Sequence, residues 1–300
     1  KPEKLMIGAQ NYFYCKIIII KLLLIGFGII IAIQNKTNFM KYIFTLLIAI
    51  ILIQISKANN IDCASSGLTF LPEKKEISLN SMFIIEGYQY GQKTIISFKN
   101  RRVYLENKKG ETVDLVLLKI HKGQMSLTQA IFKPKKELNA NSIYFLKISN
   151  QTKSEKIDFY KWNSTTSKRE PIYWKTSNKK HINFLKNDLK IQFKKTELIL
   201  YGCGPSVNAI FDIKTNDQSE VWYKTELINL TTKTKKVYII RKWQNQLNVG
   251  HGMCSGAFIF NQKGNYKVRF TPMNTDGKMN KTTKWYTFKN PNINQKGFGF

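Results

Sequence analysis

Short stretches of β-branched and aromatic residues recur along this chain from about residue 67 onward. In the first half they lie at residues 82–86, 94–98, 102–106, 113–121, 127–133 and 142–148, and short polar connectors with turn-forming residues separate them. No helical periodicity longer than a turn or two intervenes. This repeat predicts an all-β fold of antiparallel β-sandwiches.

The length of 300 residues predicts about two domains. Residues 151–170 are the most polar region, so we place the boundary there, between a first domain at 59–155 and a second at 170–290. One helical turn is expected at 181–186, and 291–300 is expected to be a flexible tail. Strands of the second domain are expected at 172–175, 189–193, 197–201, 207–214, 219–229, 236–241, 257–261, 266–271 and 285–288.

A strand with the sequence GNYKVRF at residues 264–270 precedes the turn Asn274-Thr275-Asp276-Gly277 and an aromatic last strand. This arrangement resembles the final strands of Ig-like and fibronectin-type sandwiches in secreted bacterial proteins, including envelope proteins of unknown function. The resemblance covers about 120 residues of the second half, and it implies an Ig-like second sandwich. The resemblance implies a fold but does not imply a chemical activity.

Two apolar runs precede these domains. Residues 17–33 barely reach the length of a membrane-spanning helix. The second run has Met40 and Lys41, an apolar stretch at 42–55, and small residues at Ser56 and Ala58. This order predicts a signal peptide at 40–58, cut after Ala58, and an exported protein. Residues 1–39 are then interpreted as a spurious translated leader, with a membrane helix as the alternative.

Charge composition shows 48 Lys+Arg against 19 Asp+Glu, a net +29. Arginine occurs at only five positions, and the lysines are spread along the chain rather than clustered. Nucleic-acid readers concentrate arginine on one face, so specific nucleic-acid binding is not favoured. Binding to a polyanion or a glycan stays an alternative function.

Three cysteines follow the apolar runs. Cys203 and Cys254 both lie in glycine-rich surroundings within one predicted domain, and an exported protein favours their pairing as a structural disulfide. Cys63 would then be left over. Lipid attachment to Cys63 is disfavoured, because Asp62 occupies the place where a small residue is needed.

The alternative for the second-domain cysteines is a soft-metal site for copper or zinc, built from His251, Met253, Cys254 and Cys203. The spacing does not match a blue-copper loop, and His121 and His181, the remaining histidines, have no pattern that completes a site. Residues 252–256 also spell a cysteine version of the nucleophile elbow, but a strand-like AFIF follows where that motif needs a helix.

Aromatic pairs within 159–162, at 173–174 and at 285–286 could stack on glycans, although aromatics at strand spacing more often fill a sandwich core. Taken together, the sequence predicts an exported, non-enzymatic binding or scaffolding protein of the cell envelope. No cofactor is expected. Its partner is expected to be an envelope protein or glycan, with membrane attachment only if the N-terminal segments are retained.

Overall fold

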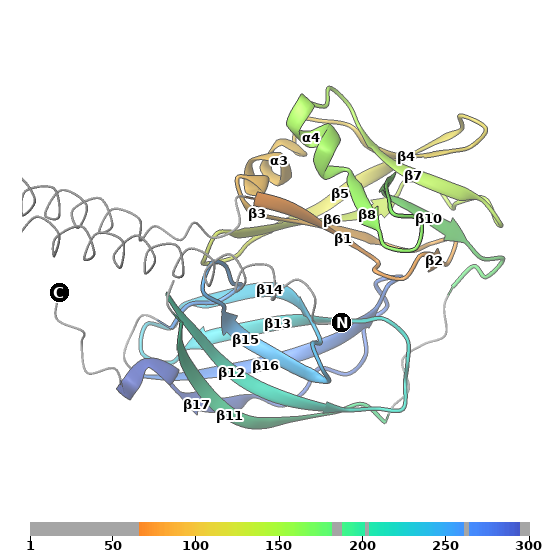
Figure 1. Ribbon diagram of the computed structural model, residues 1–300. Coiled ribbons are helices and arrows are strands. Elements are labelled where there is room, and N and C mark those ends of the chain that lie inside the picture. The colour runs from red at the N-terminus through yellow and green to blue at the C-terminus, as the bar shows by residue number, and fades with distance from the viewer. Residues whose placement is uncertain (1–65, 182–187, 202–203, 261–263, 295–300) are drawn as a thin grey trace, which may run out of the picture. The chain divides into compact units, whose positions relative to one another are not determined.

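The computed structural model describes residues 66–181, 188–201, 204–260 and 264–294 (Figure 1). All of them belong to one compact unit at 62–300. The predicted leader, signal peptide and Cys63 lie outside the described residues, as does the predicted helical turn except for His181. Among the described helices, none combines the length and apolar character needed to cross a membrane. The predicted all-β class is confirmed: strands dominate, and nearly all of them pair antiparallel.

The first sandwich is one eight-stranded sheet that folds over on itself at β5. The sheet order is β1-β3-β6-β5-β4-β7-β10-β2, and the only parallel pair within it is β10 with β2. The start of β5 pairs with β4 and the rest pairs with β6, so this strand belongs to both layers. The strands are β1 (Ser66–Leu71), β2 (Glu76–Ile77), β3 (Phe83–Gln89), β4 (Val103–Asn107), β5 (Thr112–Lys122), β6 (Leu127–Pro134), β7 (Ile143–Ile148) and β10 (Tyr173–Thr176).

Alternating inward side chains of the two layers fill the core of this first sandwich. Phe83 on β3 meets Trp174 on β10 edge to face, with ring centroids 4.7 Å apart. Because these strands lie in opposite layers of the folded sheet, this contact closes the sandwich.

The strand predicted at 94–98 is wrong: helix α3 (Gly91–Ser97) occupies this place. Thr94, Ile95 and Ile96 have strand propensity, but tertiary packing overrides it. Gly91 and Ile95 lie four residues apart on one helix face, and both are buried. Gly87 on β3 has no side chain, which lets the helix backbone lie directly on that strand.

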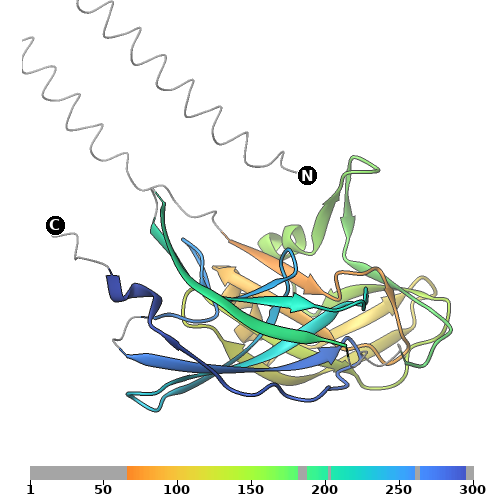
Figure 2. The same ribbon diagram turned by 90° about the horizontal axis from the view of Figure 1, so that it is seen from below.

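The polar segment at 151–170 is structured rather than a linker. It forms helix α4 (Lys153–Asp158), which a Thr152–Glu155 capping box begins, and the hairpin β8 (Tyr160–Asn163) and β9 (Lys168–Pro171). Figure 2 shows this hairpin projecting from its sandwich. The strand predicted at 172–175 is real, but as β10 it belongs to the first sheet. The change of sandwich therefore falls after residue 176 rather than within 151–170.

The second sandwich packs a three-stranded sheet, β11-β12-β15, against a four-stranded sheet, β14-β13-β16-β17. Counted along the chain, the first, second and fifth of the seven strands form one sheet, and the third, fourth, sixth and seventh form the other. This is an Ig-like arrangement. This agrees with the predicted Ig-like second sandwich. The strands are β11 (Lys190–Tyr201), β12 (Gly204–Lys214), β13 (Val221–Asn229), β14 (Lys235–Arg241), β15 (Gln246–His251), β16 (Asn265–Asn274) and β17 (Tyr286–Lys289).

Aromatic contacts tie these two sheets together. Phe211 on β12 meets Phe270 on β16 at 4.9 Å and Tyr286 on β17 at 5.5 Å between ring centroids, both edge to face. These are the preferred geometries of aromatic pairs, and they fix how the two sheets stack.

Three strand predictions in this sandwich need correction. The two strands expected at 189–193 and 197–201 are one strand, β11, with a register shift between Phe193 and Lys195. Strand β15 was not predicted, because its Asn and Gly residues weaken the strand pattern. The part of 257–261 that is described forms no strand: Phe258 and Phe260 are buried, and the Phe258 amide donates to the Gly250 carbonyl of β15 without forming a strand ladder.

The two sandwiches meet through a third apolar cluster. Trp222, Ile239 and Met273 of the second sandwich pack in it against Met82 and three further side chains of the first. Trp222 is fully buried. The first-sandwich members are Leu71, Met82, Ile84 and Ile131.

Polar contacts fix the register of this interface. The Gln129 side chain accepts from the Ile239 amide at 2.9 Å and donates to the Ile239 carbonyl at 3.1 Å, so it pairs with β14 as a strand would. The Glu220 carboxylate accepts from the backbone amides of Glu73 and Lys74 at 2.8 and 3.0 Å. These bonds join the two sandwiches in a defined orientation.

Candidate functional site

A cleft of about 510 Å³ lies where the two sandwiches meet, and we call it the interface cleft. Glu73, Glu86 and Leu127 of the first sandwich line it. The opposite wall comes from β12, β14, β15 and the loop after β15. Its volume is in the range of small-ligand sites in proteins.

Trp243 lines the cleft and is 62% exposed. It lies at the start of a two-residue turn between β14 and β15, where Trp243 and Gln246 exchange both backbone hydrogen bonds, at 2.9 and 2.8 Å. Gln244 and Asn245 in the turn have φ of 48° and 60°, the left-handed conformation of a type I′ turn. The tryptophan is therefore presented on a short, rigid hairpin rather than on a long loop.

The outward face of the β12–β15 pair supplies polar groups. Asn208 Nδ2 donates to Ser206 Oγ at 3.1 Å and to the His251 carbonyl at 3.3 Å. Asn248 lies opposite Ile210 on the neighbouring strand. Its Oδ1 is buried and has no hydrogen-bond partner among the described residues. An unpaired buried acceptor of this kind costs about 1–3 kcal/mol.

Glycine lets the loop at 252–256 fold back onto β15. An added Cβ on Gly256 would lie 2.2 Å from the His251 Cβ, and one on Gly250 would lie 1.9 Å from the Val207 carbonyl oxygen. Neither position can hold a side chain without moving the backbone. The two glycines thus shape the wall of the cleft.

Glu86 is a half-buried carboxylate of the cleft, and its side chain is 16% exposed. Tyr238 donates to its Oε2 at 2.9 Å and Gln129 does so at 3.3 Å, while an Arg241 nitrogen lies 3.8 Å from its Oε1. Burial raises the pKa of Glu86 above its usual value, although Arg241 and these two donors oppose that effect. Burial and the adjacent Glu86 charge also raise the pKa of Tyr238. Arg241 forms an ion pair with Glu73 as well.

The residues of the predicted metal site are only partly brought together. His251 is buried, and its Nδ1 lies 2.8 Å from the Gly252 carbonyl oxygen. Because a carbonyl only accepts, Nδ1 carries the proton. Cys254 is half-buried, and Gln89 Nε2 lies 3.3 Å from its carbonyl oxygen. Cys203 lies outside the described residues, so its disulfide with Cys254 stays a prediction.

The two other histidines lie elsewhere. Burial, with help from the charges of Lys119 and Lys224, lowers the pKa of His121 to about 4. His181 faces Asp276 at 3.5 Å. Within the described part of the chain, no three His, Cys, Asp or Glu side chains are grouped closely enough to hold a metal ion. The soft-metal alternative therefore gains no support.

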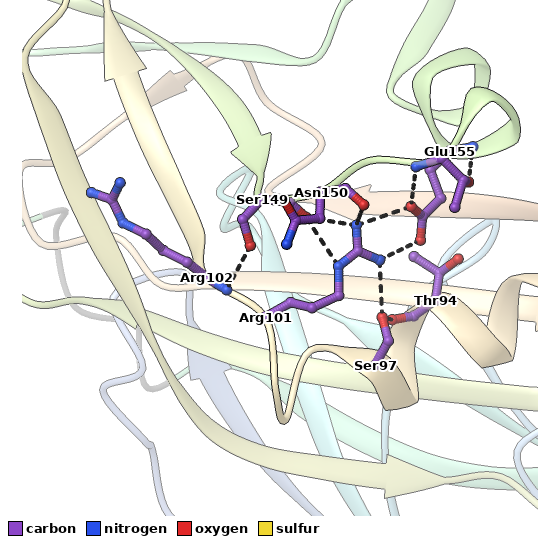
Figure 3. Close-up of polar contacts among 8 residues, drawn as sticks. Thr94, Ser97, Arg101, Arg102, Ser149, Asn150 and Glu155 are labelled. Atoms are coloured by element: carbon purple, nitrogen blue, oxygen red, sulfur yellow. Dashed lines mark hydrogen bonds and ion pairs between the residues drawn. The ribbon is translucent and has the colours of Figure 1, made fainter.

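A second polar cluster surrounds Arg101, between helices α3 and α4 of the first sandwich (Figure 3). Its guanidinium donates to both Glu155 oxygens at 2.7 and 3.0 Å, to Ser97 Oγ, and to the carbonyls of Ser149 and Asn150. Burial raises the pKa of Glu155, but the hydrogen bonds from Arg101 and Thr152 outweigh that effect and hold the pKa below its usual value. The guanidinium N–H groups of Arg101 donate to groups of the protein itself, so this cluster is structural.

The aromatic pairs singled out in the sequence divide into core and surface. Phe159 and Trp174 are buried core residues. Tyr160 and Trp162 are exposed on the projecting hairpin, with Trp162 64% exposed. Trp285 lies against the cations Lys267 and Arg269.

The sequence reasoning missed Trp243 and Asn248. The turn after Trp243 is Gln-Asn, which lacks the glycine that marks a type I′ hairpin, and β15 lacks a strand pattern. An isolated tryptophan next to Arg241 and Lys242 was the only available signal.

No protein-family model matches this chain, and no curated protein matches it. Among solved structures, it is similar to a pullulanase from Anoxybacillus sp. LM18-11 complexed with maltotriose, at 10% identity and a TM-score of 0.23. That match covers 74% of this chain and 25% of the pullulanase, so the chain spans about a quarter of that enzyme.

It is also similar to a segment of two fibronectin type-III domains from chicken tenascin, at 11% identity and a TM-score of 0.23, covering 71% of this chain and 94% of that one. A DUF4785 family protein from Legionella pneumophila matches at 9% identity and a TM-score of 0.19, over 74% of this chain and 55% of that one. Likenesses this distant carry no argument about function. The chain's own strand pairing defines its fold.

Proposed function

We propose that this chain is an exported, non-enzymatic binding protein of the cell envelope, and that the interface cleft contacts its ligand. One observation carries the binding proposal. Trp243 is 62% exposed on a rigid turn, at a cleft whose walls come from both sandwiches. Large aromatic side chains held in place beforehand are the usual anchors of binding surfaces, because little conformational entropy is lost on contact.

Two titratable groups of the cleft make structural contacts that support its role as a fixed binding surface. Glu86 is engaged by Tyr238 and Gln129, and His251 uses Nδ1 within its own loop. These groups hold the walls of the cleft in place.

A binding measurement on cell envelopes tests this proposal. Labelled protein is incubated with envelopes from its source, and the retained fraction is compared for wild type, Trp243→Ala and Trp162→Ala. Trp162 is the matched control, because it is as exposed as Trp243 but lies on the β8–β9 hairpin. We expect Trp243→Ala alone to lose retention. Equal retention of all three proteins would contradict the role of the cleft.

Export and the disulfide belong to the same proposal. The pattern at 40–58 supports export. Cys254 is disulfide-bonded. A Cβ on Gly204, the neighbour of Cys203, would lie 3.6 Å from the carbonyl oxygen of Met253, the neighbour of Cys254. This proximity supports the Cys203–Cys254 pairing.

Intact mass of the protein recovered from its source tests both points, with and without reduction and alkylation under denaturing conditions. We expect a chain that begins at Asn59 and gains two alkylated thiols on reduction. Peptide mapping is then expected to link Cys203 to Cys254. A chain that retains residues 1–58 would overturn export by signal cleavage, and a bridge from Cys63 would overturn the pairing.

A further inference from the structure

The chemistry of the interface cleft also indicates what kind of ligand it takes. We propose that the cleft binds a neutral oligosaccharide, with a sugar ring on the Trp243 indole and its hydroxyls at the amides of Asn208 and Asn248. This inference rests on the proposed function, because it concerns the same cleft. It names the ligand class, which the proposed function leaves open.

The tryptophan suits a sugar ring. A pyranose has an apolar face of C–H groups and a rim of hydroxyls, so it needs a flat apolar surface next to hydrogen-bonding groups. Trp243 gives a large exposed apolar surface, and its turn is closed by two backbone hydrogen bonds. An aromatic ring fixed in this way loses little freedom when a ligand stacks on it.

The polar wall suits the hydroxyl rim. Ser206, Asn208 and Asn248 offer hydroxyl and amide groups on the outward face of two paired strands. Amides both donate and accept, as sugar hydroxyls do. Asn248 lines the cleft and its buried Oδ1 has no partner among the described residues, so a rotation of this side chain toward the cleft would let a ligand hydroxyl donate to it. A ligand that satisfies this acceptor would remove a desolvation penalty already present in the protein.

The charges of the cleft favour a neutral ligand over a polyanion. Two cations, Arg241 and Lys242, and two carboxylates, Glu73 and Glu86, line the cleft, and Arg241 forms ion pairs with both carboxylates. A polyanion would have to compete with those two carboxylates for Arg241. Recognition of an anion needs donors that are not already committed to carboxylates.

The experiment is a direct binding screen of the purified protein. The probes are immobilised hexasaccharides of the malto, cello, xylo, manno and chito series, with oligogalacturonate and heparin as acidic comparators. Hits are titrated by calorimetry against wild type, Trp243→Ala, Trp243→Tyr, Asn248→Ala and the control Trp162→Ala. Circular dichroism confirms that each variant is folded.

We expect at least one neutral hexasaccharide to bind. Trp243→Ala should weaken that binding at least about tenfold, the loss expected for a central aromatic contact. Trp243→Tyr should weaken it less, because it keeps a stacking ring. Asn248→Ala should weaken it in a folded protein, and Trp162→Ala should leave it unchanged.

Three results would overturn the inference. The first is no binding to any neutral probe, and the second is binding only to the acidic probes with loss in salt. The third is binding that depends on Trp162 and not on Trp243. If neutral probes fail while envelope retention still requires Trp243, the carbohydrate assignment is wrong and the proposed function stands. If envelope retention also ignores Trp243, both are wrong.

Discussion

At the scale of single residues, two consecutive arginines use their charge in opposite ways. The Arg101–Glu155 pair is bidentate, and its side chains are 16% and 7% exposed. The Arg102–Asp114 pair is 50% and 40% exposed. Removing one partner of a buried pair leaves a desolvated charge, whereas an exposed pair contributes little to stability.

We therefore expect Arg101→Ala to lower the free energy of unfolding by about 3–5 kcal/mol. Arg102→Ala, the matched control, should lower it by less than about 1 kcal/mol. Urea denaturation followed by circular dichroism measures both changes. Similar losses for the two variants would show that Glu155 is not held as the structure describes.

Glu86 carries a pH prediction. Its raised pKa means that the folded protein binds this proton more tightly than the unfolded chain does. The contribution of Glu86 to the free energy of unfolding should then fall as the pH rises above 4.5, the ordinary pKa of a glutamate. We expect Glu86→Gln to gain stability relative to wild type as the pH rises over this interval.

Denaturation midpoints of wild type and Glu86→Gln, measured at several pH values from about 4 to 8, test this expectation. Glu73→Gln is the control, because Glu73 also pairs with Arg241 but is 61% exposed. If Glu86→Gln instead loses stability relative to wild type as the pH rises, the attraction of Arg241 for the Glu86 carboxylate outweighs the cost of burying that carboxylate.

At the scale of elements, helix α3 depends on a close approach to β3. A Cβ on Gly87 would lie 2.4 Å from the Gly91 carbonyl oxygen, which is backbone and cannot rotate away. We expect Gly87→Ala to lower the free energy of unfolding by about 1–3 kcal/mol through overpacking. Gly252→Ala is the control, since its nearest atom would lie 3.8 Å away. Thermal unfolding of both variants tests this, and an unaffected Gly87→Ala would show that α3 lies further from the sheet.

The same elements show how far a sequence can be interpreted. The strand predicted at 113–121 is found as β5, because its alternating apolar residues face one core. Helix α3 was missed because its burial depends on the absence of a side chain at Gly87, which lies on the preceding strand and outside the helix's own residue pattern.

The candidate site was missed for a related reason. Trp243 and Asn248 become a site only when β14 and β15 place them opposite Glu73 and Leu127 of the other sandwich. The histidine and cysteine motif at 251–254 was visible in the sequence, but it forms the loop at one side of that cleft. Site chemistry that is assembled from two domains leaves no local pattern to detect.

At the scale of the whole molecule, the two sandwiches should unfold together. Trp222 is fully buried in the cluster between them, and Gln129 binds across the same interface. We expect hydrogen exchange to report one shared free energy for the slowest amides of both sandwiches. Trp222→Ala should lower the free energy of unfolding by about 3–5 kcal/mol and give the slowest amides of the two sandwiches different exchange free energies.

Val268→Ala is the control for this prediction. Val268 is fully buried in the core of the second sandwich and is not part of the interface cluster. Its loss should lower the free energy of exchange in both sandwiches while keeping the values equal. Different exchange free energies for the two sandwiches in the wild-type protein would show that the sandwiches unfold independently.

The most direct test of the central claim, that the cleft between the sandwiches is the binding surface, is a hydrogen-exchange footprint. Exchange is compared for the protein free and bound to envelopes from its source. The account predicts slower exchange in peptides covering 238–256, with no change in the β8–β9 hairpin that carries Trp162. Protection confined to that hairpin, with 238–256 unchanged, would contradict it.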